Sequence, residues 1–320
     1  MKRNVTLLDT NNQNEKTIRI NERTGATRPQ CPACAVTARR QVGTKHGFEL
    51  LSCIGCGTLY TSTLPAPDAG EYYNVYYCES NLSTPEFVER RLDEIVRGFA
   101  PYRQSNRLLD VGFGAGGLMQ AAGRAGWQVL GAEVSTPAVE QAQRLGFEVF
   151  HGELAAAHYP DNSFDVVTAV EVFEHVPDPI SLLREMARIL RPGGLMWATT
   201  PHIGGLSGHL LKLQWSIVCP PEHLQLFSIT GMKRALAMTG FRKRHIVAQG
   251  VNPYEIIQVL RPKPPAADNT GGGECSRVVD SYRLNEYMTG SSSRRILKEA
   301  ANGVLSISRL GDSLKVWAVL

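Results

Sequence analysis

The sequence predicts an α/β protein built on a doubly wound parallel sheet, with a small cysteine-rich module in front of it. Three observations support this fold class. From Arg107 onward, short apolar runs alternate with helical patterns, as they do in consecutive βαβ units. The first of these runs ends in closely spaced glycines. Two Cys-x-x-Cys pairs precede it.

Length and composition limit the class of protein. A chain of 320 residues is long enough for one large domain and a smaller attachment. Its hydrophobic fraction of 43% and charged fraction of 20% are typical of a globular protein, and a net charge of +4 is too small to indicate nucleic-acid binding by itself. The first residues lack the sustained apolar run of a signal peptide, and no run approaches the roughly 20 residues of a membrane helix. We therefore expect a cytoplasmic protein with no membrane span.

The two cysteine pairs predict a structural zinc site. Residues 1–28 are polar and aperiodic, so a disordered tail is expected there, followed by a zinc ribbon at 29–63. The ribbon contains two Cys-x-x-Cys pairs, with 18 residues between the inner cysteines. The predicted zinc ligands are Cys31, Cys34, Cys53 and Cys56. Four thiolates would fill a tetrahedral shell and leave no position for water. A redox role is the alternative, but the βαβ context that such a motif needs is missing.

A linker and a helix come next, at 64–105. The linker is rich in Pro and Ala and runs into four tyrosines, Tyr72, Tyr73, Tyr76 and Tyr77, which suit a lid packed against the main domain or the mouth of a site. The helix that follows has apolar residues at helical spacing around 92–99.

The main domain is predicted over 106–320. Its strands are expected at 107–111, 127–133, 147–151, 164–170, 195–199, 244–248 and 315–320. Helices are expected from about 117, at 135–146, at 178–190 and at 230–238, with Gly146 and Gly240 as stop signals. A Pro/Gly-rich loop and a helical stretch around 278–301 form an insertion at 262–300, which suits a substrate lid.

The glycine-rich turn at 112–117 predicts a nucleotide-like ligand whose identity it leaves open, because Gly112, Gly114 and Gly117 also fit the dinucleotide fingerprint. Four acidic positions favour a cationic, amino-bearing ligand such as S-adenosylmethionine. Asp110 lies two residues before Gly112, where a pyrophosphate would be repelled. Glu133 ends the second strand and is placed for ribose hydroxyls, Glu153 follows the third strand near an adenine amino group, and Glu171 follows the fourth.

Five motifs in order make the chain similar to the class I S-adenosylmethionine-dependent methyltransferases, in the branch of the ubiquinone-biosynthesis O-methyltransferases. They are Leu108-Leu-Asp-Val-Gly-Phe-Gly-Ala-Gly116, Ser163-Phe-Asp-Val-Val167, Glu171-Val-Phe-Glu-His-Val-Pro-Asp178, Arg188-Ile-Leu-Arg-Pro-Gly-Gly194 and Thr199-Thr-Pro201. The resemblance covers about residues 80–250. It implies a Rossmann-like methyltransferase sheet of seven strands whose last strand is antiparallel. The cofactor contacts it implies are Asp110, Gly112, Phe113, Gly114, Gly116, Glu133, Val134, Glu153, Leu154 and Glu171.

Two histidines are the candidate catalytic residues. If the acceptor is a hydroxyl, a base must take its proton, and histidine suits that task near neutral pH. His175 follows the fourth strand, and His223 lies in the long connection after the fifth; a structural role is the alternative for each. The set Glu171, Glu174, His175 and His223 also resembles the E-x-x-E-H plus distal histidine that binds a divalent ion in some family members, which gives a second expectation for the same residues.

The predicted function is methyl transfer to a small molecule, with a sugar, a glycan precursor or a secondary-metabolite hydroxyl as acceptor; the sugar reading follows from the similarity of the ribbon to zinc modules of some sugar methyltransferases. RNA methylation is the first alternative, favoured by basic residues within the ribbon and by the run Arg242-Lys-Arg-His245. The ribbon's basic residues are Arg39, Arg40, Lys45 and His46. A non-catalytic scaffold is the second alternative. The methylated atom and the oligomeric state stay open.

Overall fold

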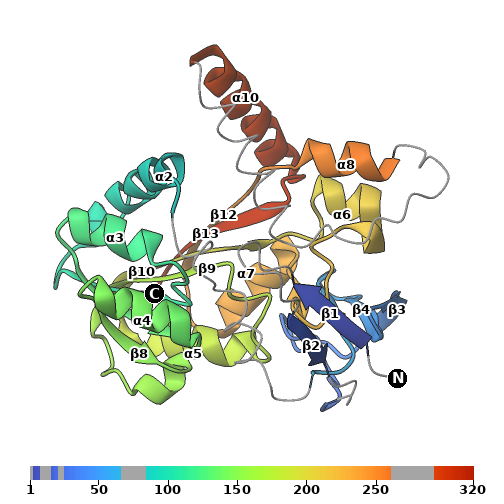
Figure 1. The fold of residues 1–320 in the computed structure, drawn as a ribbon, viewed down its shortest axis with the longest axis horizontal. Helices are drawn as coiled ribbons and strands as arrows, with labels where there is room; N and C mark the ends of the chain where they lie inside the picture. The colour runs from blue at the N-terminus through green and yellow to red at the C-terminus, as the bar shows by residue number, and fades with distance from the viewer. Residues whose placement is uncertain (1–2, 8–15, 21–24, 66–83, 261–291) are drawn as a thin grey trace.

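A seven-stranded mixed sheet forms the centre of the molecule (Figure 1). The structure, a computed structural model, describes residues 3–7, 16–20, 25–65, 84–260 and 292–320. The strands of the sheet lie in the order β12-β13-β10-β9-β6-β7-β8. Their bounds are β6 Arg107–Val111, β7 Gln128–Glu133, β8 Glu148–His151, β9 Phe164–Val170, β10 Leu190–Pro201, β12 Lys243–Gln249 and β13 Ser313–Val319. The predicted α/β fold class is confirmed.

The direction of the strands follows the family resemblance and not the simple βαβ alternation. β6, β7, β8, β9 and β10 pair in parallel, whereas β13 is antiparallel to both β10 and β12. β13 therefore lies between two strands that precede it in the chain. The carboxyl ends of the parallel strands meet at one edge of the sheet, which is where open α/β sheets bind ligands.

Helices cover both faces of the sheet, and the core is divided accordingly. Leu108 and Val166 belong to one apolar cluster, while their neighbours Leu109 and Val167 belong to another, because successive side chains of a strand point to opposite faces. The first cluster includes residues of α2 (Glu86–Arg97), α3 (Gly117–Arg124) and α4 (Thr136–Arg144). The second includes residues of α5 (Pro179–Ile189) and α7 (Ile229–Met238). The parallel strands are thus buried on both sides, as their continuous apolar sequences require.

Local sequence signals explain where several elements begin. Asp178 caps α5, its carboxylate accepting hydrogen bonds from the backbone N–H groups of Ile180 and Ser181. Ser228 caps α7 in the same way through Gly231. β10 is longer than expected: the Pro-Gly-Gly stretch after α5 is part of the strand, with an irregular register between Leu190 and Leu195, and is not only a turn.

The cysteine ribbon shares its sheet with the main domain. Its strands are β3 (Arg39–Lys45), β4 (Phe48–Cys53) and β5 (Leu59–Thr61), and β5 pairs antiparallel with β11 (Gln225–Leu226). The order is β11-β5-β4-β3. Because β11 comes from the connection between β10 and α7, the ribbon and the main domain are joined by backbone hydrogen bonds.

Two short strands are described within the stretch that was predicted to be a disordered tail. β1 (Arg3–Leu7) and β2 (Lys16–Ile20) pair antiparallel. Residues 25–28 belong to the ribbon, since the N–H of Gly25 donates to the Leu64 carbonyl and Thr27 forms a bridge with Thr63. Polar composition hides this arrangement, because backbone pairing needs no apolar side chains.

The remaining helices of the described chain are short or lie in the second half of the sequence. They are α6 (Leu206–Leu211), α8 (Pro253–Leu260) and α10 (Ser292–Ser308), with short 3-10 turns η2 (Ala100–Tyr102), η3 (Leu154–Ala157) and η4 (Lys212–Gln214). α10 projects from the body of the molecule (Figure 1) and overlaps the expected helix at 278–301 only in its first half. The four linker tyrosines and the loop at 262–276 lie outside the described residues. In the described chain, no helix combines the length and apolar character needed to span a bilayer.

Candidate active site and cysteine cluster

The glycine turn between β6 and α3 uses backbone conformations that favour glycine. φ is +64° at Gly112, +51° at Gly114 and +74° at Gly116. At Gly112 an added Cβ would lie 2.6 Å from a methyl of Val172, so this glycine also serves packing. At Gly116 an added Cβ would meet no atom within 4 Å. The space in front of Gly116 is therefore open in the protein itself, as a binding turn requires.

Glu133 links this turn to the end of β7. One carboxylate oxygen, Oε2, accepts a hydrogen bond of 3.0 Å from the N–H of Gly114. The other, Oε1, accepts from the N–H groups of Val134 (2.8 Å) and Ser135 (3.0 Å). The side chain is 5% exposed. The predicted ribose acceptor thus also holds two loops of the site together.

Asp110 is buried at the end of β6, beside the glycine turn. Its Oδ1 accepts a 2.6 Å hydrogen bond from the hydroxyl of Thr168 on β9. Burial raises the pKa of Asp110 to about 7; the Thr168 hydrogen bond opposes this shift and the nearby charge of Glu133 adds to it. The sequence did not identify Thr168, although a lone hydroxyl within the apolar run after Asp165 was the available signal.

The remaining predicted cofactor residues lie in different environments. The backbone of β8 is tied to β7 by a 2.8 Å hydrogen bond from the N–H of Gly152 to the Glu133 carbonyl. Glu153 after it is exposed, whereas Leu154 is buried. Phe113 is 7% exposed, and an added Cβ at Gly131 would lie 2.6 Å from its ring. The Phe113 side chain therefore packs in the core of the sheet.

Two carboxyl groups meet at the carboxyl end of β9. Glu171 has a left-handed backbone with φ +52°, which is uncommon for a residue other than glycine. Glu171 is exposed, whereas Glu174 is buried, and the pKa of Glu174 lies well above its usual range because of desolvation and the neighbouring Glu171. Glu174 is 1% exposed and accepts a 2.8 Å hydrogen bond from the Thr200 hydroxyl. Two close carboxylates cannot both ionise at low cost, so a cation would be welcome here.

The two predicted catalytic histidines lie side by side. The ring centroids of His175 and His223 are 4.7 Å apart, with the rings edge to face. Nε2 of His175 lies 3.8 Å from Oε1 of Glu174. Burial first, and the neighbouring His223 second, lower the pKa of His175 to about 3, so this imidazole is neutral near pH 7.

Backbone carbonyls fix the tautomer of both rings. Nδ1 of His175 lies 3.0 Å from the Glu222 carbonyl, and Nδ1 of His223 lies 2.7 Å from the Ile217 carbonyl. A carbonyl can only accept, so each Nδ1 carries the proton and Nε2 carries the lone pair. The Sγ of Cys219 also lies 3.3 Å from Nδ1 of His223. Because that nitrogen is protonated, the group Cys219, Glu222 and His223 is a poor metal site, whereas Glu174, His175 and His223 form a plausible one.

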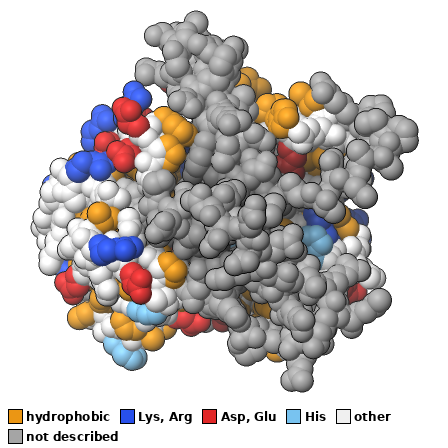
Figure 2. Space-filling model, viewed as in Figure 1, with side chains coloured by type: hydrophobic (Ala, Val, Ile, Leu, Met, Phe, Trp, Pro, Cys, Tyr) orange, Lys and Arg blue, Asp and Glu red, His pale blue; other side chains and the backbone are white. Residues whose placement is uncertain are grey.

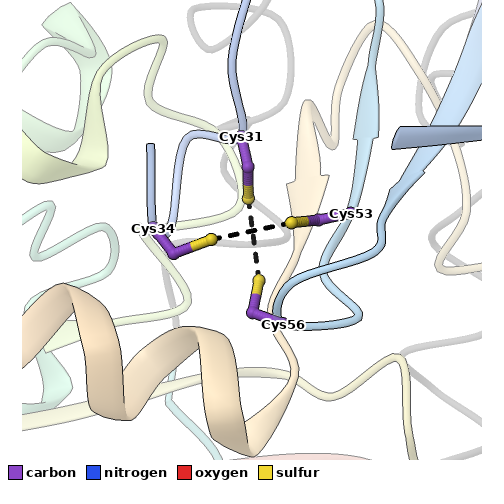
Figure 3. Close-up of side chains that lie close together, drawn as sticks. All are labelled: Cys31, Cys34, Cys53 and Cys56. Atoms are coloured by element: carbon purple, nitrogen blue, oxygen red, sulfur yellow. Dashed lines mark hydrogen bonds between the residues drawn. The ribbon is translucent and has the colours of Figure 1, made fainter. Parts of the chain in front are cut away.

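The four predicted zinc ligands converge in the ribbon (Figure 3). The Sγ atoms of Cys31 and Cys56 are 3.7 Å apart, and those of Cys34 and Cys53 are 3.6 Å apart. Zn–S bonds of about 2.3 Å place tetrahedral sulfurs about 3.8 Å apart. The sulfur geometry therefore fits zinc.

The two cysteine turns have the same backbone pattern. The N–H of Cys31 donates to the Val36 carbonyl, and that of Cys53 donates to the Thr58 carbonyl. The fifth residue of each turn is left-handed, with φ +80° at Gly57 and +56° at Ala35. Glycine favours this conformation at Gly57, whereas alanine rarely adopts it, so the conformation at Ala35 could not be read from the sequence.

The comparisons place this geometry in a family. A family described as a methyltransferase domain matches residues 85–246, about half of the chain. A ubiquinone biosynthesis O-methyltransferase of Paracidovorax citrulli is 37% identical over 198 residues, which cover 59% of this chain and 75% of that protein. The chain belongs to the methyltransferase-domain family. As a member, it is a class I enzyme that depends on S-adenosylmethionine.

Two further proteins are similar to this methyltransferase. A 27-O-demethylrifamycin SV methyltransferase of Amycolatopsis mediterranei is 35% identical over 136 residues, covering 39% of this chain and 49% of that protein. A solved SAM-dependent methyltransferase from Archaeoglobus fulgidus has a TM-score of 0.50 at 18% identity, covering 78% of this chain and 100% of that one. The latter likeness supports the Rossmann-like methyltransferase fold alone.

Proposed function

We propose that this methyltransferase transfers the methyl group of S-adenosylmethionine to a hydroxyl oxygen of a small molecule. The residues proposed to bind the cofactor are the predicted set: Asp110, Gly112, Phe113, Gly114, Gly116, Glu133, Val134, Glu153, Leu154 and Glu171. The bound cofactor supplies a methyl group already activated by a positively charged sulfur. The chain's own residues then have three tasks: to align the acceptor with the methyl carbon, to exclude water and to remove a proton.

The tautomer of His223 is the observation that supports this function most strongly. With Nδ1–H directed to the Ile217 carbonyl, Nε2 is the basic nitrogen of the ring. The neighbouring His175 ring is neutral, so proton transfer to His223 does not meet a second charged imidazole. We assign His223 as the general base that takes the acceptor's hydroxyl proton, with His175 beside it in the second catalytic position.

The relatives guide the choice of acceptor. Two of the similar proteins act in ubiquinone biosynthesis and on 27-O-demethylrifamycin SV, as their names state. Both names describe O-methylation of a small molecule. We propose a ubiquinone precursor or a secondary metabolite as the first acceptors to test. A sugar or glycan precursor is supported only by the analogy of the ribbon.

Two metal sites are part of the proposal. Zinc at Cys31, Cys34, Cys53 and Cys56 would be structural, because four sulfurs complete its coordination. As an alternative to the base mechanism, a divalent ion would be held by Glu174, His175 and His223, with Glu171 next to Glu174. Because Nδ1 of His223 donates to the Ile217 carbonyl, the ion would take the lone pair of Nε2, and His223 would then be a metal ligand and not the base. Such an ion would polarise an acceptor hydroxyl and favour the ionised form of the two carboxyl groups.

Substitution of the histidines tests the proposal. His223→Ala should reduce kcat on an accepted hydroxyl substrate about 10²- to 10⁴-fold, the usual contribution of a general base, and leave the Kd of S-adenosylmethionine within about twofold. His245→Ala is the matched control, because His245 is exposed and its ring lies 5.5 Å from that of Trp317 on β13. Wild-type turnover in His223→Ala would refute the base assignment. Titration of the chelated enzyme with Mg²⁺ tests the divalent ion separately.

The described contacts weigh against the RNA alternative. Three of the four basic ribbon residues hydrogen-bond to carbonyls of the protein itself: Arg39 to Arg28 and Pro29, Lys45 to Trp215, and His46 to Pro220. RNA binding that weakens steeply with salt would revive this alternative. The non-catalytic scaffold is set aside, because the chain belongs to an enzyme family and has an intact glycine turn.

A further inference from the structure

Arg28 is a buried cation at the junction between the ribbon and the main domain. The residue is 7% exposed and lies three positions before the first cysteine of the ribbon. Burial lowers the pKa of Arg28 to about 10, so the guanidinium is still charged near pH 7. Its Cζ lies 5.7 Å from the centroid of the Tyr60 ring. Burying a charged group costs free energy unless its N–H groups form hydrogen bonds. The acceptors of Arg28 therefore indicate its role in the structure.

All three side-chain acceptors of Arg28 lie in the main domain. Nη1 donates to the Leu224 carbonyl at 3.2 Å. Nη2 donates to the side-chain oxygen of Gln225 at 2.7 Å and to the Pro177 carbonyl at 3.3 Å. Leu224 and Gln225 are at β11, and Pro177 ends the loop after β9. The guanidinium therefore bridges two segments that flank the histidine pair.

Gln225 extends this bridge along the loop. Its amide nitrogen donates to the carbonyls of Phe173 (2.5 Å) and Val176 (2.9 Å), and the residue is 1% exposed. The backbone N–H groups of Leu224 and Gln225 both point to the Glu174 carbonyl, at 2.7 and 3.3 Å. The carbonyls of residues 173, 174, 176 and 177 are thus all held from β11 or Arg28. Glu174 and His175 lie within this fastened loop.

We infer that Arg28 is a positioning residue for methyl transfer: the ribbon, through Arg28 and Gln225, holds the 173–177 loop so that His175 and Glu174 keep their places beside His223. The inference rests on the proposed function, in which the histidine pair serves the acceptor side of the reaction. A displacement of about 1 Å in such a group can cost about 10²-fold in rate. The cofactor side does not depend on this link, because Asp110 and Glu133 are held by Thr168 and by the backbone of residues 114, 134 and 135.

The test separates turnover from cofactor affinity. Arg28→Ala should lower kcat about 10- to 100-fold while the Kd of S-adenosylmethionine stays within about twofold. Arg39→Ala is the matched control, since Arg39 is an exposed ribbon arginine that donates to the carbonyls of Arg28 and Pro29 inside the ribbon. It should keep kcat within about twofold. Zinc content and far-ultraviolet circular dichroism establish that each variant is folded.

A second variant covers the case in which Arg28→Ala does not fold. Gln225→Glu keeps an acceptor for the guanidinium but removes the amide N–H groups that hold the Phe173 and Val176 carbonyls. It should show the same loss of kcat with unchanged cofactor affinity. Wild-type kcat in folded, zinc-loaded Gln225→Glu or Arg28→Ala would overturn the inference.

A double substitution distinguishes positioning from a general loss of structure. If Arg28 acts through the histidine pair, Arg28→Ala adds less than about a threefold loss of kcat in a His223→Ala background. Multiplied losses would overturn the inference. If His223→Ala alone keeps wild-type turnover, the proposed function fails instead, and the two failures are therefore told apart.

Discussion

Asp110 is a buried carboxyl in the proposed cofactor site, where it would favour a cationic ligand. Its pKa is raised to about 7 by burial, against the pull of the Thr168 hydroxyl. In the free protein the proton therefore stays on this carboxyl through mildly acidic pH. A positively charged ligand bound beside Asp110, as proposed, would favour the carboxylate and expel the proton.

This gives a pH dependence with a definite sign. The affinity for S-adenosylmethionine should rise about tenfold per pH unit as the pH increases towards 7, and level off above it, because less proton has to be expelled. Isothermal titration between pH 5.5 and 8.5 measures this, including the proton released. Asp110→Asn should bind weakly and lose the dependence. A flat profile in the unsubstituted protein would refute the role of Asp110.

Residues of the motifs could be found from the sequence because their chemistry is local. Asp110, Glu133 and the glycines follow strands or turns that the apolar pattern locates. Arg28 could not be found, since it lies in a polar stretch that resembles a solvated tail. Its acceptors, Leu224, Gln225 and Pro177, are distant in the chain. Only the fold brings them around the guanidinium.

At the scale of elements, the turn between β6 and α3 combines strained backbone with open space. Gly116 precedes the first residue of α3, and its left-handed conformation costs a residue with a Cβ about 1–2 kcal/mol. Gly126 after α3 has nearly the same conformation, φ +80°, and an added Cβ there also meets nothing within 4 Å. The two glycines thus have similar φ angles and similar free space, but only Gly116 lies in the glycine turn before α3.

This pair separates backbone strain from ligand contact. Gly116→Ala and Gly126→Ala should lower the free energy of unfolding by similar amounts, about 1–2 kcal/mol in urea denaturation. Gly116→Ala should also weaken the binding of S-adenosylmethionine more than tenfold, because its methyl group enters the space proposed for the cofactor. Gly126→Ala should leave the Kd unchanged. Equal affinities in the two variants would contradict the placement of the cofactor.

The predicted strands and helices of the main domain agree with the structure to within a few residues at most boundaries, because apolar periodicity and caps are local signals. β11 was not predicted. It has two residues, and its sequence, Gln225–Leu226, carries no strand pattern of its own. It forms because β5 of the ribbon offers an edge. Local sequence patterns could therefore not predict the sheet that the ribbon shares with the main domain.

For the whole molecule, the shared sheet predicts that the ribbon and the main domain unfold together. The Thr61 N–H donates to the Leu224 carbonyl, and the Ser228 hydroxyl donates to the Cys56 carbonyl. Ser228 also caps α7, so its side chain connects a proposed zinc ligand with a helix of the main domain. Loss of the proposed zinc should therefore destabilise the main domain as well as the ribbon.

Zinc removal tests this cooperation. Cys53→Ser should lose stoichiometric zinc and lower the Tm by at least about 5 °C in one calorimetric transition. Cys219→Ser is the control, because Cys219 lies outside the four-sulfur cluster, and it should retain zinc. A separate early transition, with the main transition unchanged, would show that the ribbon unfolds independently.

The place of β13 bears on how the chain reaches this structure during synthesis. In the described structure, β12 hydrogen-bonds to β13 and to no other strand, and β13 itself fills the gap beside β10. Until residues 313–319 leave the ribosome, one edge of β10 has unpaired backbone groups next to the apolar side chains of Leu195, Met196 and Trp197. Such an edge can pair with a strand of another polypeptide. Nascent enzyme is therefore exposed to intermolecular strand pairing until β13 has been synthesised, and chaperones that shield such edges would act on it before that point.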